Sequence, residues 1–144
     1  MYHAIDDGDD ELGVSPLELR RQIEWLLNHG YAVVSLSQLV EDMAKDAGPA
    51  LDCSIAITFD DGYVDFAESA VPILTELGIP ATVFVVTGKL GQSCDWGNGS
   101  ALRRRLLARK ELLDLKAVYP QLMVGSHSHD HVKLTNVTVK GLEE

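Results

Sequence analysis

The chain of 144 residues is 46% hydrophobic and has a formal net charge of −10 at pH 7, a composition that fits one compact domain with one core. So negative a chain repels phosphate backbones and anionic membrane surfaces, which argues against nucleic acid as a partner. No apolar run approaches the roughly 20 residues of a membrane span, and no basic-then-apolar segment marks a signal peptide.

The first half of the chain alternates predicted helices and strands. Ser15 is a predicted N-cap, with Pro16 at the first helical position, Glu18 completing a capping box and Gly30 as the C-terminal stop. Leu19, Ile23, Leu26 and Leu27 share one helical face. The predicted elements are a helix over 15–30, a short strand over 31–36, a helix over 37–48 and a strand over 54–59 that is buried on both faces.

The second half continues the alternation. Its predicted elements are a helix over 64–77 ended by Gly78 and Pro80, a buried strand over 81–86, a glycine-rich loop over 87–100, a charged amphipathic helix over 101–118 and a strand over 122–126. Residues 103–105, a run of three arginines, are expected on the solvated face of that last helix. The alternation predicts a parallel α/β sheet or barrel, in which chemistry is placed at the carboxyl ends of the strands.

Several isolated features receive ordinary structural interpretations. Cys53 and Cys94 belong to opposite ends of the predicted sheet, so two thiols are expected rather than a disulfide. His29 is expected at a helix C-terminus, where the dipole favours it. Asn98 and Asn136 begin glycosylation-like tripeptides, which occur often by chance.

Carboxylates and histidines follow two of the predicted strands. Asp60 and Asp61 come directly after the strand over 54–59, and His127, His129 and His131 follow the strand over 122–126. His127 and His131 share a face if the backbone there turns helically, a familiar geometry for two metal ligands. Asp61 would complete a facial set of two histidines and one carboxylate, which leaves Asp60 as a general base.

Each half of this pattern also has a simpler explanation. Two aspartates before a glycine are typical of a turn or a helix N-cap, and histidines are common on solvated loops. Their occurrence together at matching strand ends favours the metal site.

Two motifs resemble those of a known family. The segment "TFDDG" followed by "GSHSHDHVKLT" is similar to the polysaccharide deacetylase family, also called carbohydrate esterase family 4 or the chitooligosaccharide deacetylase homology domain. The opening "YH" and residues 14–39 also resemble the start of many members. The resemblance implies a distorted (β/α) barrel of seven strands and an acetylated amino-sugar polymer or oligomer as substrate. Many members are exported or associated with the cell envelope.

The resemblance also implies roles for four residues. It makes Asp60 the catalytic base, and makes Asp61, His127 and His131 the ligands of one divalent metal ion, usually zinc. Trp96 is predicted either to stack on a sugar ring or to be buried in a packed loop.

The sequence departs from the family pattern in three respects. Val132 stands where the family usually has proline, and His129 is an added imidazole that should point away from its neighbours. The family's later motifs, an arginine that positions the base, a tryptophan-bearing stretch and a Leu-x-His with the general acid, are missing. Residues 1–144 are therefore expected to form one deacetylase-like domain truncated at its C-terminal side, an incomplete N-terminal portion of the barrel with little activity alone.

The leading hypothesis for function is metal-dependent hydrolysis of N-acetyl groups on an amino-sugar polymer. One alternative is a non-catalytic, metal- or carbohydrate-binding remnant of the fold. Another is a related amidohydrolase that acts on a non-sugar amide. Chitin oligomers, peptidoglycan and biofilm glucosamine polymers all remain open as substrates.

Overall fold

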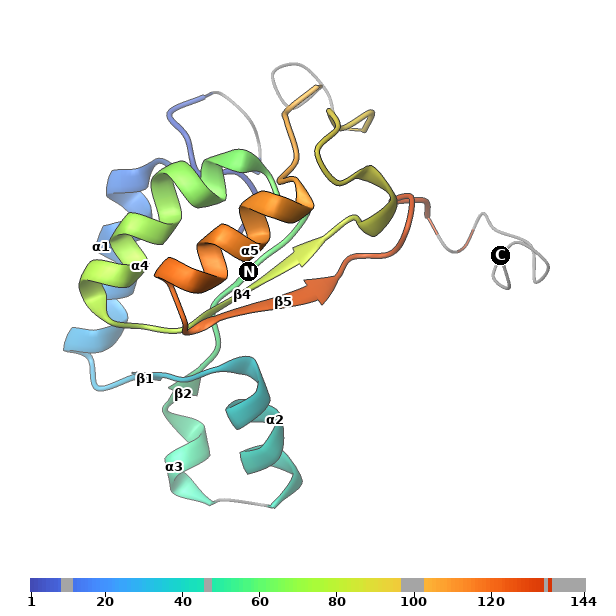
Figure 1. The fold of residues 1–144 in the computed structure, drawn as a ribbon. Coiled ribbons are helices and arrows are strands. Elements are labelled where there is room, and N and C mark those ends of the chain that lie inside the picture. The colour runs from blue at the N-terminus through green and yellow to red at the C-terminus, as the bar shows by residue number, and fades with distance from the viewer. Residues whose placement is uncertain (9–11, 46–47, 97–102, 134, 136–144) are drawn as a thin grey trace.

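The computed structural model describes residues 1–8, 12–45, 48–96, 103–133 and 135. These form an α/β fold (Figure 1). Its helices are α1 (Pro16–Asn28), α2 (Leu36–Ala44), α3 (Pro49–Asp52), the π-helix η1 (Phe66–Ala70), α4 (Val71–Leu77), the 3-10 helix η2 (Thr87–Lys89) and α5 (Arg109–Val118). Its strands are β1 (Ala32–Val33), β2 (Ser54–Ile55), β3 (Thr58–Phe59), β4 (Ala81–Val85) and β5 (Leu122–Ser126).

The strands form two parallel sheets. β1 pairs with β2, and a separate sheet has the order β3-β4-β5. In the larger sheet Phe59 pairs with Val83, and β4 and β5 pair from Ala81↔Leu122 to Val85↔Ser126. The carboxyl ends of its three strands therefore lie at one edge, where the segments that follow β3, β4 and β5 meet.

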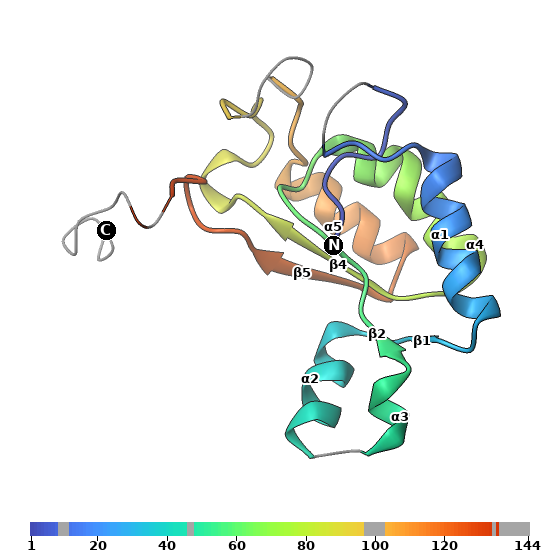
Figure 2. The ribbon, with the colours of Figure 1, turned by 180° about the vertical axis from the view of Figure 1, so that it is seen from behind.

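The helices α1, α4 and α5 lie together on one side of the larger sheet (Figure 1). In the view from behind (Figure 2), α2 and α3 extend away from these helices together with β1 and β2. The buried residues between helices and sheet are Ile5, Leu19, Ile23, Ile57, Phe59, Phe66, Ala70, Val71, Ile73, Leu74, Ile79, Ala81, Val83, Val85, Leu107, Leu112, Tyr119 and Leu122.

Helix α1 begins at the predicted N-cap and ends just before the predicted glycine, but the predicted capping box is only half formed. Ser15 Oγ accepts a hydrogen bond from the Glu18 N–H at 3.2 Å, and Gly30 follows the helix with a φ of +83°. The Glu18 carboxylate accepts from the Gln22 side chain. Leu19 and Ile23 are buried in the core, whereas Leu27 is 36% exposed, so the buried stripe is narrower than the apolar stripe in the sequence.

The predicted strand over 54–59 is two strands. β2 belongs to the small sheet, where the Val34 N–H donates to Ile55 O at 2.9 Å, whereas the Thr82 N–H donates to Ile57 O at 3.0 Å beside β3. The prediction of one strand was wrong because the chain exchanges its partner, from β1 to β4, within a continuous apolar run. The spacing of apolar residues in the sequence carries no signal of such a change of pairing partner.

The predicted helix over 101–118 was also wrong in its first part. Helix α5 begins only at Arg109, and the Ala108 N–H donates to the Glu111 carboxylate at 2.8 Å. Before it, Leu106 forms an antiparallel bridge with Tyr63. The arginine run therefore does not lie on a helix, because tertiary pairing overrides its local helical pattern.

The structure also tests the predicted fold class and the predicted state of the two cysteines. The α/β class with parallel strands is confirmed, although the described strands form two separate sheets without closing into a barrel. Cys53 is exposed, Cys94 is buried, and neither forms a disulfide. Among the described helices, none has the length and apolar character needed to cross a membrane. Asn98 and Asn136 lie outside the described residues.

Two leucines from the region that the sequence predicts as one helix differ in their burial in the structure. Leu107 is 1% exposed and lies in the core, whereas Leu113 is 61% exposed on α5. We expect Leu107→Ala to lower the free energy of unfolding by about 2–5 kcal/mol. The matched control Leu113→Ala should change it by no more than about 0.5 kcal/mol. Urea denaturation measures both values, and equal losses would contradict the described burial.

Candidate metal centre

A tight turn directly after β3 carries the two predicted carboxylates. The Asp60 N–H donates to Tyr2 O and the Gly62 N–H donates to Asp60 O, both at 2.9 Å. Asp61 and Gly62 have left-handed φ values of 69° and 72°. A Cβ at Gly62 would lie 2.7 Å from Val85 Cγ1, so only glycine fits this position without movement of β4. The packing leaves Asp61 3% exposed.

The Asp61 carboxylate lies between two imidazoles. Its Oδ1 is 3.5 Å from His127 Nε2 and 3.1 Å from His131 Nε2, and the three residues offer ligand atoms within 4.8 Å of one another. Asp61 Oδ1 is buried and accepts no hydrogen bond from any described residue. A buried carboxylate oxygen without a donor is costly. A divalent cation would satisfy it, so this donor set fits a metal ion.

The two histidines reach Asp61 from an irregular loop after β5. The His127 N–H donates to Val85 O at 2.8 Å and continues the pairing of β5 with β4. Ser128 and His131 then have left-handed φ values of 64° and 56°, and the His131 N–H donates to Ser128 Oγ at 3.0 Å. The prediction that His127 and His131 would come together through a helical turn was therefore wrong. The loop brings the two rings together through two residues with left-handed φ values instead.

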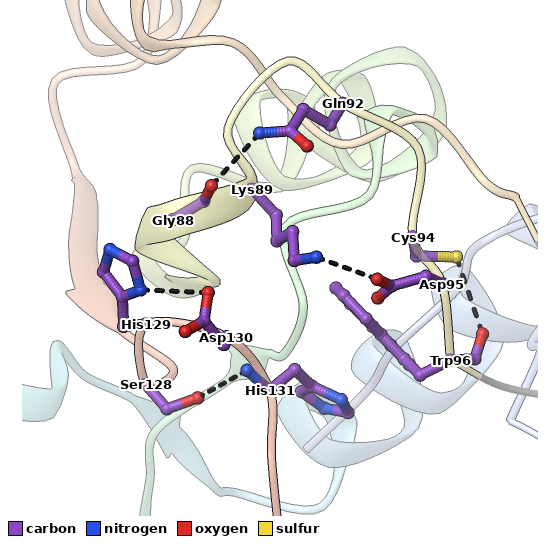
Figure 3. Close-up of polar contacts among 10 residues, drawn as sticks. All are labelled: Gly88, Lys89, Gln92, Cys94, Asp95, Trp96, Ser128, His129, Asp130 and His131. Atoms are coloured by element: carbon purple, nitrogen blue, oxygen red, sulfur yellow. Dashed lines mark hydrogen bonds and ion pairs between the residues drawn. The ribbon is translucent and has the colours of Figure 1, made fainter. Parts of the chain in front are cut away.

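His129 points away from the three converging groups, as its spacing predicts. Its Nδ1 is 3.0 Å from Asp130 Oδ1, and its side chain is 76% exposed. Figure 3 shows this pair on the opposite side of the loop from Trp96. The Gly88 N–H donates to His129 O at 2.9 Å, and a Cβ at Gly88 would lie 2.6 Å from His129 Cε1. The loop after β4 thus closely supports the histidine loop.

Trp96 contacts two of the predicted metal ligands. Its Nε1 donates to Asp61 Oδ2 at 3.3 Å and to the Tyr63 hydroxyl at 3.1 Å. Its ring stacks on His131 with centroids 4.2 Å apart and planes inclined by 26°, and Figure 3 shows the two side chains facing each other. The indole is partly buried. Trp96 is therefore packed against the loop and the proposed ligands, and its contact with a sugar ring stays a prediction.

The two neighbouring aspartates differ in their surroundings. Asp61 converges with His127 and His131, whereas Asp60 is not one of the three groups gathered there. Asp60 is 9% exposed. This difference is compatible with separate roles for the pair, one as a ligand and one in proton transfer.

Sequence reasoning missed a buried charged group beside this site. The Arg104 side chain is only 12% exposed, and its guanidinium pairs with Asp6 and with Asp65, in the second case at 3.1 Å. It also lies over the Tyr63 ring, 5.7 Å from the centroid. The prediction of a solvated arginine run was therefore wrong for Arg104, although Arg105 does lie at the surface, where it pairs with Glu111.

No local signal in the sequence points to this arrangement. Residues 104–107 read Arg-Arg-Leu-Leu, without the apolar–polar alternation that is typical of a half-buried strand. In the structure Leu106 packs with Tyr63 and Leu107 enters the main core, whereas Arg105 faces outward. These positions are set by tertiary contacts that the residue pattern does not record.

The two carboxyl groups that pair with Arg104 have pKa values shifted in opposite directions. Burial raises the pKa of Asp65 to about 6, an effect that a hydrogen bond from the Ile5 N–H and the charge of Arg104 only partly oppose. The hydrogen bond from Arg104 holds the pKa of Asp6 below its usual value. The pKa of Tyr63 is raised by burial and by its hydrogen bond to Asp61.

Comparison with known proteins identifies the family. The family model for polysaccharide deacetylase matches residues 47–144. The chain belongs to the polysaccharide deacetylase family. It is 28% identical over 138 residues to the Bacillus subtilis protein YxkH, described as a polysaccharide deacetylase, a match that covers 96% of this chain and 44% of that one. It is 35% identical over 79 residues to the poly-beta-1,6-N-acetyl-D-glucosamine N-deacetylase of Staphylococcus aureus, covering 55% of this chain and 27% of that one.

Solved deacetylase structures share the fold. The chain matches the Streptococcus pyogenes deacetylase PplD, solved in complex with acetate, with a TM-score of 0.75 and 27% identity, covering 96% of this chain and 58% of that one. It matches IcaB from Ammonifex degensii with a TM-score of 0.74 and 24% identity, and this match covers 90% of this chain and 51% of that one. The chain thus spans less than half of YxkH and between half and three fifths of these two solved chains.

The pKa of Asp65 predicts a pH dependence of stability. The Asp65 carboxyl group binds its proton more tightly in the native state than in the unfolded chain, where its pKa is 3.8. The contribution of Asp65 to stability therefore falls as the pH rises from about 4 to about 6. Asp65→Asn removes this titration, so the stability of the variant relative to the wild type should increase over that interval. Urea denaturation at several pH values measures the difference.

Asp114→Asn is the matched control for loss of one negative charge, since the Asp114 side chain is 63% exposed and pairs with Lys110 at the surface. Its stability relative to the wild type should change less with pH than that of Asp65→Asn. A constant difference between Asp65→Asn and the wild type from pH 4 to 6 would show that Asp65 does not carry the raised pKa.

Proposed function

We propose that this protein hydrolyses N-acetyl groups on an amino-sugar polymer or oligomer and yields acetate and a free sugar amine. The observation that carries this proposal is the buried Asp61 oxygen that faces both His127 and His131 in a chain of the polysaccharide deacetylase family. The substrate class is supported by the similarity to the Staphylococcus aureus enzyme named for poly-beta-1,6-N-acetyl-D-glucosamine. Acetate, present in the PplD structure, is the acid product of such a reaction.

In this proposal Asp61, His127 and His131 hold one divalent cation, and zinc is the metal that we propose. Two neutral imidazoles and one carboxylate are a common zinc ligand set that leaves a net positive charge. When bound, a divalent cation supplies Lewis acidity, which polarises a carbonyl group and makes water more acidic. Trp96 holds the other oxygen of Asp61 at 3.3 Å, which leaves Oδ1 directed at the imidazoles.

Asp60 is the proposed general base. Its backbone is fixed by hydrogen bonds to Tyr2 and Gly62, in the turn that also carries the proposed ligand Asp61. Attack of water on an amide requires that a proton be removed from the water as the C–O bond forms. Asp60 takes that proton. Before the C–N bond breaks, the sugar nitrogen must be protonated by a general acid other than the four residues given roles above.

Trp96 is the proposed substrate-binding residue. One face of its ring stacks on His131, yet the side chain keeps part of its surface accessible. An aromatic surface next to a catalytic centre suits the apolar face of a sugar ring. In this proposal Trp96 supports the ligands and contacts the sugar.

For the domain as a whole we infer a distorted (β/α) barrel of the seven-stranded deacetylase type, of which residues 1–144 are the N-terminal portion. The two parallel sheets and the helices on one side of the larger sheet are compatible with that architecture. The solved deacetylases, which extend well beyond the matched region, support the same inference.

The ligand assignment predicts the effect of three histidine substitutions. His127→Ala and His131→Ala should each weaken binding of Zn²⁺ by about tenfold or more, because each removes one of three protein ligands. His129→Ala is the matched control from the same loop, and it should bind Zn²⁺ as the wild type does because His129 pairs with Asp130 instead. Isothermal titration calorimetry measures the affinities. Undiminished affinity in both of the first two variants would refute the site.

The base assignment predicts a separation of binding from turnover. Asp60→Asn is nearly isosteric but takes no proton at neutral pH, so it should keep its Zn²⁺ affinity and lose about 10²-fold or more in kcat. The control Asp130→Asn, whose side chain is 56% exposed, should keep its rate. Release of acetate from acetylated glucosamine oligomers, with Zn²⁺ supplied, measures turnover in a chain extended through the rest of the barrel, because residues 1–144 alone are expected to have little activity.

The outcomes of these assays distinguish the candidate functions. A wild-type protein that binds Zn²⁺ and deacetylates the oligomers supports the proposal. Binding without turnover of any amide, in the chain extended through the rest of the barrel, would make the protein a metal- or carbohydrate-binding member of the family. Cleavage of small amides but not of sugars would make it an amidohydrolase with a different substrate.

A further inference from the structure

We infer that Arg104 is a positioning residue for Asp61, acting through Tyr63 and Trp96. The inference rests on the proposed function, in which Asp61 is a metal ligand. It gives a role to a charged group that the deacetylation chemistry leaves unused.

Arg104 joins segments that are far apart in the sequence. Its guanidinium pairs with Asp6, from the N-terminal segment, and with Asp65, which directly precedes η1. Only 12% of its side chain and 15% of the Asp65 side chain are exposed. A largely buried cation is retained only when its partners compensate for lost hydration. The two carboxylates do so, and they fix the guanidinium beside Tyr63.

From Tyr63 the contacts continue to Asp61. The guanidinium lies 5.7 Å from the centroid of the Tyr63 ring, within the range of a cation–π interaction. The Tyr63 hydroxyl accepts from Trp96 Nε1 at 3.1 Å, and the same Nε1 donates to Asp61 Oδ2 at 3.3 Å. A displaced Tyr63 ring would therefore move the indole that holds one oxygen of the proposed ligand.

The backbone around Arg104 connects the same groups. The Cys94 N–H donates to Arg104 O at 2.8 Å, two residues before Trp96, and the Leu107 N–H donates to Gly62 O at 2.8 Å, one residue after Asp61. The Arg104 segment thus lies between the loop that carries Trp96 and the turn that carries Asp61. Its position sets the separation of the two hydrogen-bonded side chains.

The side-chain chemistry favours arginine here over lysine. A planar guanidinium can donate to two carboxylates and lie over an aromatic ring at the same time, whereas an ammonium group is a compact point charge. Arg104→Lys should therefore restore only part of the geometry. Groups that orient metal ligands typically change metal affinity by about 10- to 100-fold when they are removed.

The experiment measures Zn²⁺ affinity by calorimetry, well below the melting temperature of each variant. Arg104→Gln should weaken binding by about tenfold, and Arg104→Lys should give an intermediate value. Arg105→Gln is the matched control, since Arg105 is the adjacent arginine and its exposed side chain pairs with Glu111. This control should keep the wild-type affinity.

A double-mutant cycle separates positioning from general stability. Trp96→Phe removes the N–H that holds Asp61, so it should weaken Zn²⁺ binding by itself. If Arg104 acts through Trp96, the double variant should lose less affinity than the product of the two single losses. The absorption spectrum of bound Co²⁺ should change in the same direction in both single variants, because it reports ligand geometry.

Each outcome decides between the two proposals. Wild-type affinity in Arg104→Gln, or fully multiplicative losses in the cycle, would overturn the positioning role while leaving the metal site intact. Absence of Zn²⁺ binding by the wild-type protein would overturn the proposed function, and the role of Arg104 with it.

Discussion

The buried carboxylate of Asp61 is the constraint on which the rest of the site depends. A carboxylate that is 3% exposed has lost most of its hydration, and such a group must be compensated by hydrogen bonds, by opposite charge or by a metal ion. Trp96 compensates one oxygen. The other oxygen faces His127 and His131. The fold therefore encloses a negative charge that a bound cation would neutralise.

Parallel strand order explains how three distant segments reach that charge. β3, β4 and β5 are neighbours in one sheet and run in one direction, so the turn after β3, the loop after β4 and the histidine loop after β5 emerge together. Gly62 and Gly88 then allow close approach, the first against Val85 and the second against His129. The sheet brings the segments together, and the two glycines let them pack closely.

The sequence predicted the strand-end residues well because their signals are local. Each of the two site motifs directly follows an apolar strand, and parallel order places both at one edge whatever the loops do. Trp96 was predicted with two environments, since nothing local chooses between a sugar and a packed loop. Arg104 was predicted wrongly, because a helical pattern of charges and leucines conceals a short extended segment whose pairing partners lie some 10 and 40 positions away.

These successes and failures have a common physical origin. Candidate ligands can be recognised from residue type and spacing, because metal coordination demands particular atoms. The groups that support them are chosen by tertiary packing, and a tyrosine, an arginine and two aspartates become partners only when the chain has folded. The bridges of Leu106 with Tyr63 and of Arg105 with Ser93 are long-range contacts of this kind. Stability and site geometry therefore depend on the same residues, and a substitution beside Asp61 can alter the ligand without touching it.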